Sequence, residues 1–302
     1  MPPSAPSPGT DIGESTSART DVASSPAVGE TRKAYFALAA SGGREVLTPL
    51  APARSGWGGG GQLNGSAVSG ALIRATERLA SELGGADSFR PVRWAVDLYR
   101  PAAAAECAVD VTVVRQGRRL RLIDAALVQD GIPVARSSLL LLVTGEAGEG
   151  TTWSGSGSAA VAILRRAVGC WRSDAYYSDG VGWTRRLHDH RNAHRKATWH
   201  PPTPIVDGET LSPLQHAAAV ADIASLVVGW GTTGAEYINT DVGLVLSRRP
   251  RRVDGVGLVA QDRAEEEGVA VGRATLFDRD GDLGEVTVST IRSPERAQGN
   301  GF

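Results

Sequence analysis

A single carboxylate, Asp222, interrupts the apolar stretch QHAAAVADIASLVV at residues 215–228, where a charged group needs an explanation. Removal from water disfavours the charged form of a carboxyl group, so apolar neighbours raise its pKa and make it a stronger base. Such a base can take a proton from a water molecule that attacks a carbonyl carbon. Two other interpretations stay open. Asp222 could lie on a solvent-exposed stripe with Gln215 and Ser225, or it could be neutralised by a structural arginine.

A second candidate site lies in the sequence GGGGQLNGSAV, at residues 58–68, which leads into a predicted helix. Asn64 has a side chain suited to a helix N-cap, and Gly65 follows it. The N–H groups of a first helical turn have no partner within the helix, so they can stabilise an oxyanion. Asn64 is therefore either a plain cap or, with Gly65, a substrate contact. The irregular glycine spacing fits no dinucleotide or phosphate-loop motif.

Four histidines cluster near the middle of the chain, at His188, His190, His194 and His200. On a strand the first three would share a face, where a metal ion could bind. A polar hairpin ahead of the second helix is the competing interpretation, and we predict no metal site. Cys107 and Cys170 form no CxxC pair, so we expect neither a zinc site nor a disulfide framework.

The elements that must position these residues follow from hydrophobic periodicity. Apolar residues at residues 66–84 recur at helical spacing and predict a helix of about five turns. Its apolar face comprises Val68, Leu72, Ala75, Leu79 and Leu83, and its polar side comprises Arg74, Glu77 and Arg78. Alternating or β-branched runs at residues 92–101, 106–131 and 132–145 then predict an antiparallel meander.

The second part of the chain repeats this order. Residues 215–228 predict its helix, and runs at residues 237–250, 255–281 and 282–291 predict its strands. The same two dipeptides recur at nearly equal spacing in both parts. Arg100-Pro101 precedes Asp130-Gly131 by 30 residues, and Arg249-Pro250 precedes Asp280-Gly281 by 31. These matches indicate a duplicated unit, in which each helix and sheet leaves an apolar surface that its twin can cover.

Composition sets the boundaries of these units. The first 31 residues hold no aromatic residue and no leucine, so they cannot bury enough surface to offset the entropy of ordering. A similar stretch rich in Gly, Ser and Thr interrupts the middle of the chain. We predict a disordered tail at residues 1–33, an N-terminal unit at 34–146, a linker at 147–165, a C-terminal unit at 166–294 and a flexible end at 295–302.

The charge balance limits the classes of partner. The 32 lysines and arginines nearly match the 33 aspartates and glutamates, so no field of one sign attracts nucleic acid or an anionic membrane. No apolar run approaches the ~20 residues that cross a bilayer, and the N-terminus lacks the pattern of a signal peptide. We therefore expect a cytoplasmic protein that acts on a small molecule.

Four segments make the fold more specific, at residues 53–79, 90–102, 212–231 and 237–250. They resemble the actinobacterial acyl-CoA thioesterase-like proteins, which are relatives of the bacterial type II thioesterases, and the resemblance covers about residues 34–292. It implies an α+β double hotdog, in which two tandem units each wrap a curled antiparallel sheet around a long helix. It also implies hydrolysis of a fatty or related acyl-CoA without a cofactor, and possible homo-oligomers.

The same resemblance suggests roles for individual residues. In type II thioesterases the base is an Asp in the helix of the second unit, and Asp222 falls on that position. The family's Thr and Gln, which hold the attacking water, fall near Asn239, with Thr240 beside it, and near Ser289. Asn64 stands where related proteins commonly carry His. These changed residues favour one alternative, a non-catalytic protein that binds acyl-CoA or an acyl carrier.

A hotdog hydratase or dehydratase is the second alternative. The residues Asp189, Asn192 and His194 are similar to the Asp-Asn-His set of such enzymes. The match lacks the proline before the histidine, and the spacing from Asp to Asn is one residue longer. The apolar candidates to line or bound the acyl channel are Trp94, Val96, Leu98, Leu226, Val227 and Trp230, although core packing is the larger use for most of them.

Overall fold

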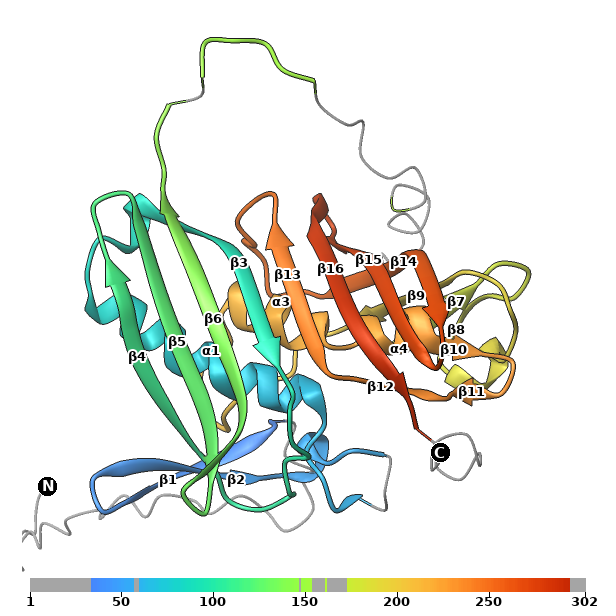
Figure 1. Cartoon of the computed structure of the whole chain (residues 1–302), viewed down its shortest axis with the longest axis horizontal. Helices are drawn as coiled ribbons and strands as arrows, with labels where there is room; N and C mark the ends of the chain where they lie inside the picture. Colours follow the sequence, from blue (N-terminus) through green and yellow to red (C-terminus); the bar gives the residue numbers. More distant parts are fainter. Residues whose placement is uncertain (1–33, 57–59, 147, 154–160, 162–172, 294–302) are drawn as a thin grey trace, which may run out of the picture. The chain divides into compact units, whose positions relative to one another are not determined.

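The computed structural model describes residues 34–56, 60–146, 148–153, 161 and 173–293 (Figure 1). The predicted tail at residues 1–33, the predicted C-terminal end at 295–302 and most of the predicted linker at 147–165 lie outside the described residues. Among the described helices, none is long and apolar enough to cross a membrane.

One antiparallel sheet joins the two halves of the chain. Its order is β4 (Ala108–Gln116), β5 (Leu120–Gln129), β6 (Ile132–Val143), β3 (Phe89–Asp97), β13 (Asp241–Leu246), β16 (Gly281–Arg292), β15 (Val269–Asp278), β14 (Val256–Glu266), β9 (Lys196–His200), β7 (Ala175–Ser178) and β8 (Gly182–Thr184). The halves meet where β3 pairs with β13, from Asp97 opposite Asp241 to Arg93 opposite Val245. Figure 1 shows this junction at the centre of the sheet.

Both halves use the same strand pairing, and it differs from the predicted meander. The last three strands of each half are consecutive neighbours, as predicted. The first strand is not next to the second: β3 pairs with β6, and β13 pairs with β16. Since β3 and β13 also pair with each other, the first strand of each half forms the junction and lies away from its successor in sequence.

Short elements complete the described structure, and most of them have no clear signal in the sequence. The strands are the hairpin β1 (Phe36–Ser41) and β2 (Arg44–Pro49), the pair β10 (Trp230–Gly231) and β11 (Gly234–Ala235), and β12 (Tyr237–Asn239), which pairs with β16. The 3-10 helices are η1 (Ala51–Ala53), η3 (Ala86–Ser88) and η4 (Leu187–His190).

The two Asp-Gly turns of the predicted repeat are not equivalent. Asp130 and Gly131 have φ angles of 50° and 75° and form the two-residue turn between β5 and β6, as an Asp-Gly hairpin favours. In the second half Asp278 pairs with Gly281, so Arg279 and Asp280 form the turn and Gly281 begins β16. This shift accounts for the spacing of 31 residues in place of 30.

The first helix forms where it was predicted, as α1 (Gly65–Glu82), but it is buried on two sides. One side packs on β4, β5 and β6, and another packs on α3 (Pro213–Ala221). Arg74 was predicted to lie off the buried face, and this is wrong: its side chain is 3% exposed and bonds Glu209 and Glu45. The pattern of α1 alone could not indicate this, because the carboxylates that bind Arg74 come from distant segments.

The second helix is interrupted, although the sequence predicted one continuous helix. Ser212 caps α3 through a capping box with Gln215, and α3 ends at Ala221. A second helix, α4 (Ala224–Gly229), follows directly. Between α3 and α4 the backbone hydrogen bonds join residues three apart, as in a 3-10 helix. The Ser225 N–H, for example, donates to the Asp222 carbonyl at 3.2 Å. The Ser225 hydroxyl donates to the same carbonyl at 3.0 Å, so Asp222 lies at the break.

Arg74 and Arg78 both bind Glu45, and the burial of Arg74 predicts that it contributes more to the free energy of unfolding than Arg78 does. Arg74→Met keeps the apolar stem but removes a charge-assisted bond network inside the fold, so we expect a loss of about 2 kcal/mol in the free energy of unfolding. Arg78→Met is the matched control, because its side chain is 52% exposed and its ion pair should contribute under about 1 kcal/mol. Urea unfolding measures both, and equal losses would contradict the structural role of Arg74.

Candidate active site

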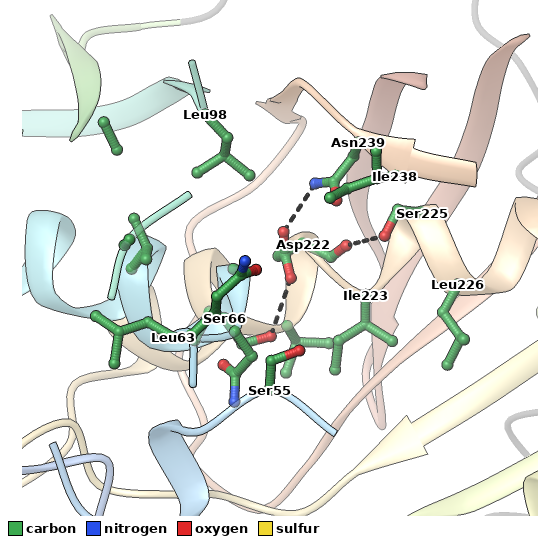
Figure 2. Close-up of a pocket in the computed structure, with 18 of the residues that line it drawn as sticks. Ser55, Leu63, Ser66, Leu98, Asp222, Ile223, Ser225, Leu226, Ile238 and Asn239 are labelled. Carbon is green, nitrogen blue, oxygen red and sulfur yellow. Dashed lines mark hydrogen bonds between the residues drawn. The ribbon is translucent and has the colours of Figure 1, made fainter. Parts of the chain in front are cut away.

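A cavity of about 1410 Å³ opens where the start of α1, the break between α3 and α4, and the end of β12 come together. Figure 2 shows its lining from these separate segments. The candidate residues of the sequence analysis all line it: Asn64, Gly65, Asp222, Asn239, Thr240 and Ser289. The structure therefore brings residues from both halves of the chain to one site.

Asp222 is the centre of this site. The residue is 9% exposed, so the interpretation as part of a solvent-exposed stripe is wrong. Asn239 donates its side-chain N–H to Oδ1 of Asp222 at 2.9 Å, and the Ser66 hydroxyl lies 3.4 Å from Oδ2 (Figure 2). Gln215, one of the two other members of that stripe, donates to Glu77 at 2.9 Å.

The Asp222 carboxylate lies directly against the first residue of α1. A Cβ atom added at Gly65 would be 2.1 Å from Oδ1 and 2.6 Å from Oδ2 of Asp222, distances that no side chain can occupy. The positive end of the α1 dipole interacts favourably with a negative charge placed there. The sequence signal for this contact was the glycine after the cap, but nothing in the sequence identified its partner.

Asn64 is a helix cap, which was one of its two predicted roles. Its Oδ1 accepts from the Ala67 N–H at 2.8 Å, and its Nδ2 donates to the Pro52 carbonyl at 2.8 Å. Both ends of the amide are therefore committed to holding the start of α1. Asn64 fixes the position of Gly65 and Ser66 at the edge of the cavity.

A β-bulge turns Asn239 toward Asp222. Asn239 pairs with Thr290 in β16, whereas Gly243 pairs with Thr287, so four steps along one strand match three along the other. Without the extra residue, the Asn239 side chain would lie on the same face of the sheet as Gly243 and would point away from the helices. Bulges of this kind redirect side chains next to functional sites. The strand pattern of the sequence could not reveal it, because a bulge is defined by the partner strand.

Thr240 and Ser289 contribute to the bulge rather than to the contacts of Asp222. The Thr240 N–H and hydroxyl both donate to the Ser289 carbonyl, at 2.9 and 3.2 Å. Because side chains alternate along β16, Ser289 lies on the face opposite to Thr290 and therefore opposite to Asn239. The register thus places Thr290, which the sequence analysis did not select, beside Asn239. Its hydroxyl donates to the Ala270 carbonyl at 3.0 Å.

Of the six apolar candidates for the acyl channel, two line the cavity, and core packing was the expected use of most of them. Leu98 and Leu226 line the cavity (Figure 2). The other four candidates do not, and Trp94 is fully buried in the core, where its indole N–H donates to Ser69 at 3.0 Å. Long apolar side chains in a strand serve packing first, and the sequence does not distinguish a core face from a cavity wall.

The histidine-rich segment at residues 185–200 contains the 3-10 helix η4 and the buried strand β9, and the β7–β8 hairpin lies before it, so the prediction of a polar hairpin in this segment is wrong. The ring of His190 lies between the hydroxyls of Ser178 and Thr184, at 2.9 and 3.0 Å, and burial lowers its pKa. Asp189 pairs with Arg186, so the hydratase-like residues are held within this segment and do not line the cavity. Across the described residues, no group of three or more His, Cys, Asp or Glu could hold a metal ion.

The arrangement of sheet and helices is that of the hotdog fold. A hotdog protein from Alicyclobacillus acidocaldarius superposes with a TM-score of 0.60 at 15% identity, covering 87% of this chain and 98% of that one. The tesB protein of Mycobacterium avium subsp. paratuberculosis gives 0.57 at 14% identity, covering 85% and 96%. An acyl-CoA thioesterase II from Mycobacterium marinum gives 0.51 at 12%, covering 73% and 87%.

Family comparison gives the class within that fold. Residues 53–142 match the acyl-CoA thioesterase N-terminal domain, and residues 148–284 match the acyl-CoA thioesterase C-terminal domain. The chain belongs to the acyl-CoA thioesterase family, and it is a thioesterase of the hydrolase class. No curated protein matches its sequence significantly.

The contact between Asp222 and Gly65 predicts that this glycine cannot be replaced. Gly65→Ala would force the carboxylate away from α1, and we expect a loss of roughly 1–3 kcal/mol in the free energy of unfolding. Gly229→Ala is the matched control, since it is also helical and an added Cβ would meet nothing within 4 Å. Urea unfolding compares them, and equal stability of the two variants would show that the carboxylate does not lie against Gly65.

Proposed function

We propose that this thioesterase hydrolyses a fatty or related acyl-CoA by direct attack of water, with Asp222 as the general base. The observation that carries the proposal is the buried Asp222 carboxylate, held by Asn239 in a cavity and set against the start of α1. A carboxylate there can take the proton of a water molecule as that water attacks the thioester carbon. No metal ion or organic cofactor is needed for this step.

The site has groups that can stabilise the charges that form during the reaction. As the water oxygen bonds to the carbonyl carbon, negative charge grows on the carbonyl oxygen, and N–H groups at the start of α1 would stabilise it. The tetrahedral intermediate then collapses, the C–S bond breaks, and the thiolate of coenzyme A leaves. The proton held by Asp222 passes to this thiolate or to solvent, and the products are a carboxylic acid and coenzyme A.

Asn239 acts in this proposal as the residue that positions the base. Its amide N–H donates to Oδ1 of Asp222, and the Ser66 hydroxyl lies 3.4 Å from Oδ2. The family's Thr would supply a hydroxyl at this position, and the longer amide of Asn239 supplies an N–H donor instead. We assign Ser289 and Thr240 a supporting role, because their bonds hold the bulge that directs Asn239.

We further propose that the chain is two tandem hotdog units, at residues 34–146 and 166–294. The equal strand pairing in the two halves and the separate N- and C-terminal family matches support this division. Each unit contributes one part of the site: the first supplies the start of α1, and the second supplies Asp222 and Asn239. The cytoplasmic location and a homo-oligomeric state remain predictions.

The first test is thiol release from a panel of acyl-CoAs, measured with a thiol reagent. Asp222→Asn keeps the size of the side chain but removes the base, so we expect kcat to fall by about 10²–10⁴. The control is Asp124→Asn, an exposed residue of β5 outside the cavity. Hydrolysis that survives in Asp222→Asn would reject Asp222 as the base. Binding of acyl-CoA without thiol release would favour the non-catalytic alternative, which the changes at Asn64, Asn239 and Ser289 motivate.

The second test separates the hydrogen bond of Asn239 from its shape. Asn239→Thr restores a hydroxyl donor, whereas Asn239→Val has nearly the same shape as that threonine and no donor. We expect the valine variant to be about tenfold or more slower than the threonine variant, since the buried carboxylate loses a charge-assisted bond. Steady-state kinetics with one acyl-CoA provides the measurement. Equal rates for the two variants would show that Asn239 does not position Asp222 through hydrogen bonding.

A further inference from the structure

The outer face of the sheet carries a group of side chains that neither the core nor the proposed hydrolysis uses. The helix α1 packs on the inner face of β4, β5 and β6 (Figure 1), and these side chains point the other way. We call the group the arginine–leucine face and define it by six residues: Arg93, Arg115, Leu120, Leu122, Leu140 and Leu142.

Strand register brings these six residues together. Consecutive cross-strand partners form one row across four strands, in the order Arg115, Leu122, Leu140 and Arg93. The next row pairs Leu120 with Leu142, and Leu142 has Arg90 as its partner on β3. Alternate residues of a strand share a face, so these leucines point outward, whereas Leu139 and Leu141 between them point into the core.

The face is open to solvent and cationic at its edges. Leu142 is 39% exposed, and the other three leucines are half-buried. Arg93 and Arg115 are exposed, as are Arg118 and Arg119 in the turn between β4 and β5. Within the described part of the chain, all ion pairs of arginine involve other arginines than these four.

Two carboxylates border the face and do not balance its charge. Asp124 follows Leu122 by two residues on β5, and Glu285 lies opposite Val245, the β13 partner of Arg93. The four arginines therefore leave a local positive charge, although acids and bases nearly balance over the whole chain. Charges act over about 8 Å at physiological salt, so the local excess is what a partner at this face meets.

These arginines are separate from the cavity. The described lining of the cavity includes none of the four. On β3 the lining begins at Asp97, four residues and roughly 13 Å along the strand from Arg93. Phosphate groups of a coenzyme A bound in the cavity therefore do not account for the arginine–leucine face.

A lipid surface with anionic headgroups matches both parts of this face. The planar guanidinium group binds phosphate oxygens through two parallel hydrogen bonds, and its apolar stem can lie beside the leucines against the acyl region. A small soluble anion would leave the leucines in water. A second copy related by a two-fold axis would place the same face against itself and bring like charges together.

We propose that the arginine–leucine face binds an anionic phospholipid surface, so that the protein attaches reversibly to a membrane. The charge balance of the sequence predicted no such attraction, because a sum over the chain does not show where the charges gather. Attachment by this face leaves the cavity accessible and does not depend on the proposed hydrolysis. Long acyl groups enter bilayers because burial of each methylene is favourable, so attachment would bring the protein to acyl substrates.

The experiment is co-sedimentation of the full chain with phosphatidylcholine vesicles that contain roughly one third phosphatidylglycerol, and with vesicles of phosphatidylcholine alone. We expect binding to the anionic vesicles only, and weaker binding at higher salt. The combined variant Arg93→Gln, Arg115→Gln and Arg119→Gln should reduce partitioning at least about tenfold, since each arginine near an anionic surface contributes about fivefold.

The matched control is the combined variant Arg185→Gln, Arg186→Gln and Arg195→Gln. These arginines are also exposed but belong to the segment around η4, and their replacement removes the same three charges. The control should bind the anionic vesicles like the wild type. Equal losses in the two triple variants would show that only net charge matters and would overturn the proposal, as would a wild-type protein that stays in solution.

Two further measurements separate the alternatives. Sedimentation velocity detects self-association, and self-association that the Arg93, Arg115 and Arg119 variant abolishes, without vesicle binding, would assign the face to a second copy and overturn the lipid proposal. Thiol release from acyl-CoA in solution should be the same in both triple variants as in the wild type, because none of the six arginines lines the cavity in the described structure. Failure of hydrolysis and failure of membrane attachment are therefore distinguishable.

Discussion

The contact between the Asp222 carboxylate and the backbone of Gly65 is the constraint on which the site depends. It joins the start of α1 in the first half of the chain to the helix break in the second half. The two helices must approach closely for this contact to form. Small residues permit that approach: Ser69 of α1 donates to the Ala218 carbonyl of α3 at 2.8 Å. The helix pair is thus part of the core and also the frame of the site.

Regular secondary structure is interrupted at two places beside the site, once in a helix and once in a strand. The break between α3 and α4 lies at Asp222, where a continuous helix would have kept all its bonds. The bulge at Thr240 costs a regular ladder bond and turns Asn239 inward. Each departure is stabilised locally, the first by Ser225 and the second by the Ser289 carbonyl. Both irregularities serve one hydrogen bond, from Asn239 to Asp222.

The cavity is lined by several charged and polar side chains as well as apolar ones. A carboxylate removed from water is unfavourable without partners, and Asp222 has an amide donor and a helix start beside it. His200, which lines the same cavity, is buried, and its Nδ1 lies 3.1 Å from Oδ1 of Asp174. Asp222 and His200 therefore each have a partner from a distant segment of the chain, so the polarity of the cavity depends on the tertiary structure.

The sequence by itself determined the local elements and most of their residues. Apolar spacing located α1 and the strands β3 to β6 and β13 to β16, the Asn-Gly pair located the helix cap, and the charge within an apolar run located Asp222. These features follow from periodicity, capping and turn preference, which act over a few residues. Tertiary structure decided the rest. The burial of Arg74 depends on Glu209, 135 residues away, and the direction of Asn239 depends on the register with Thr290. Partners that meet only after folding leave no local pattern, so the sequence and its resemblance could propose the base and nearby residues but not the contacts between them.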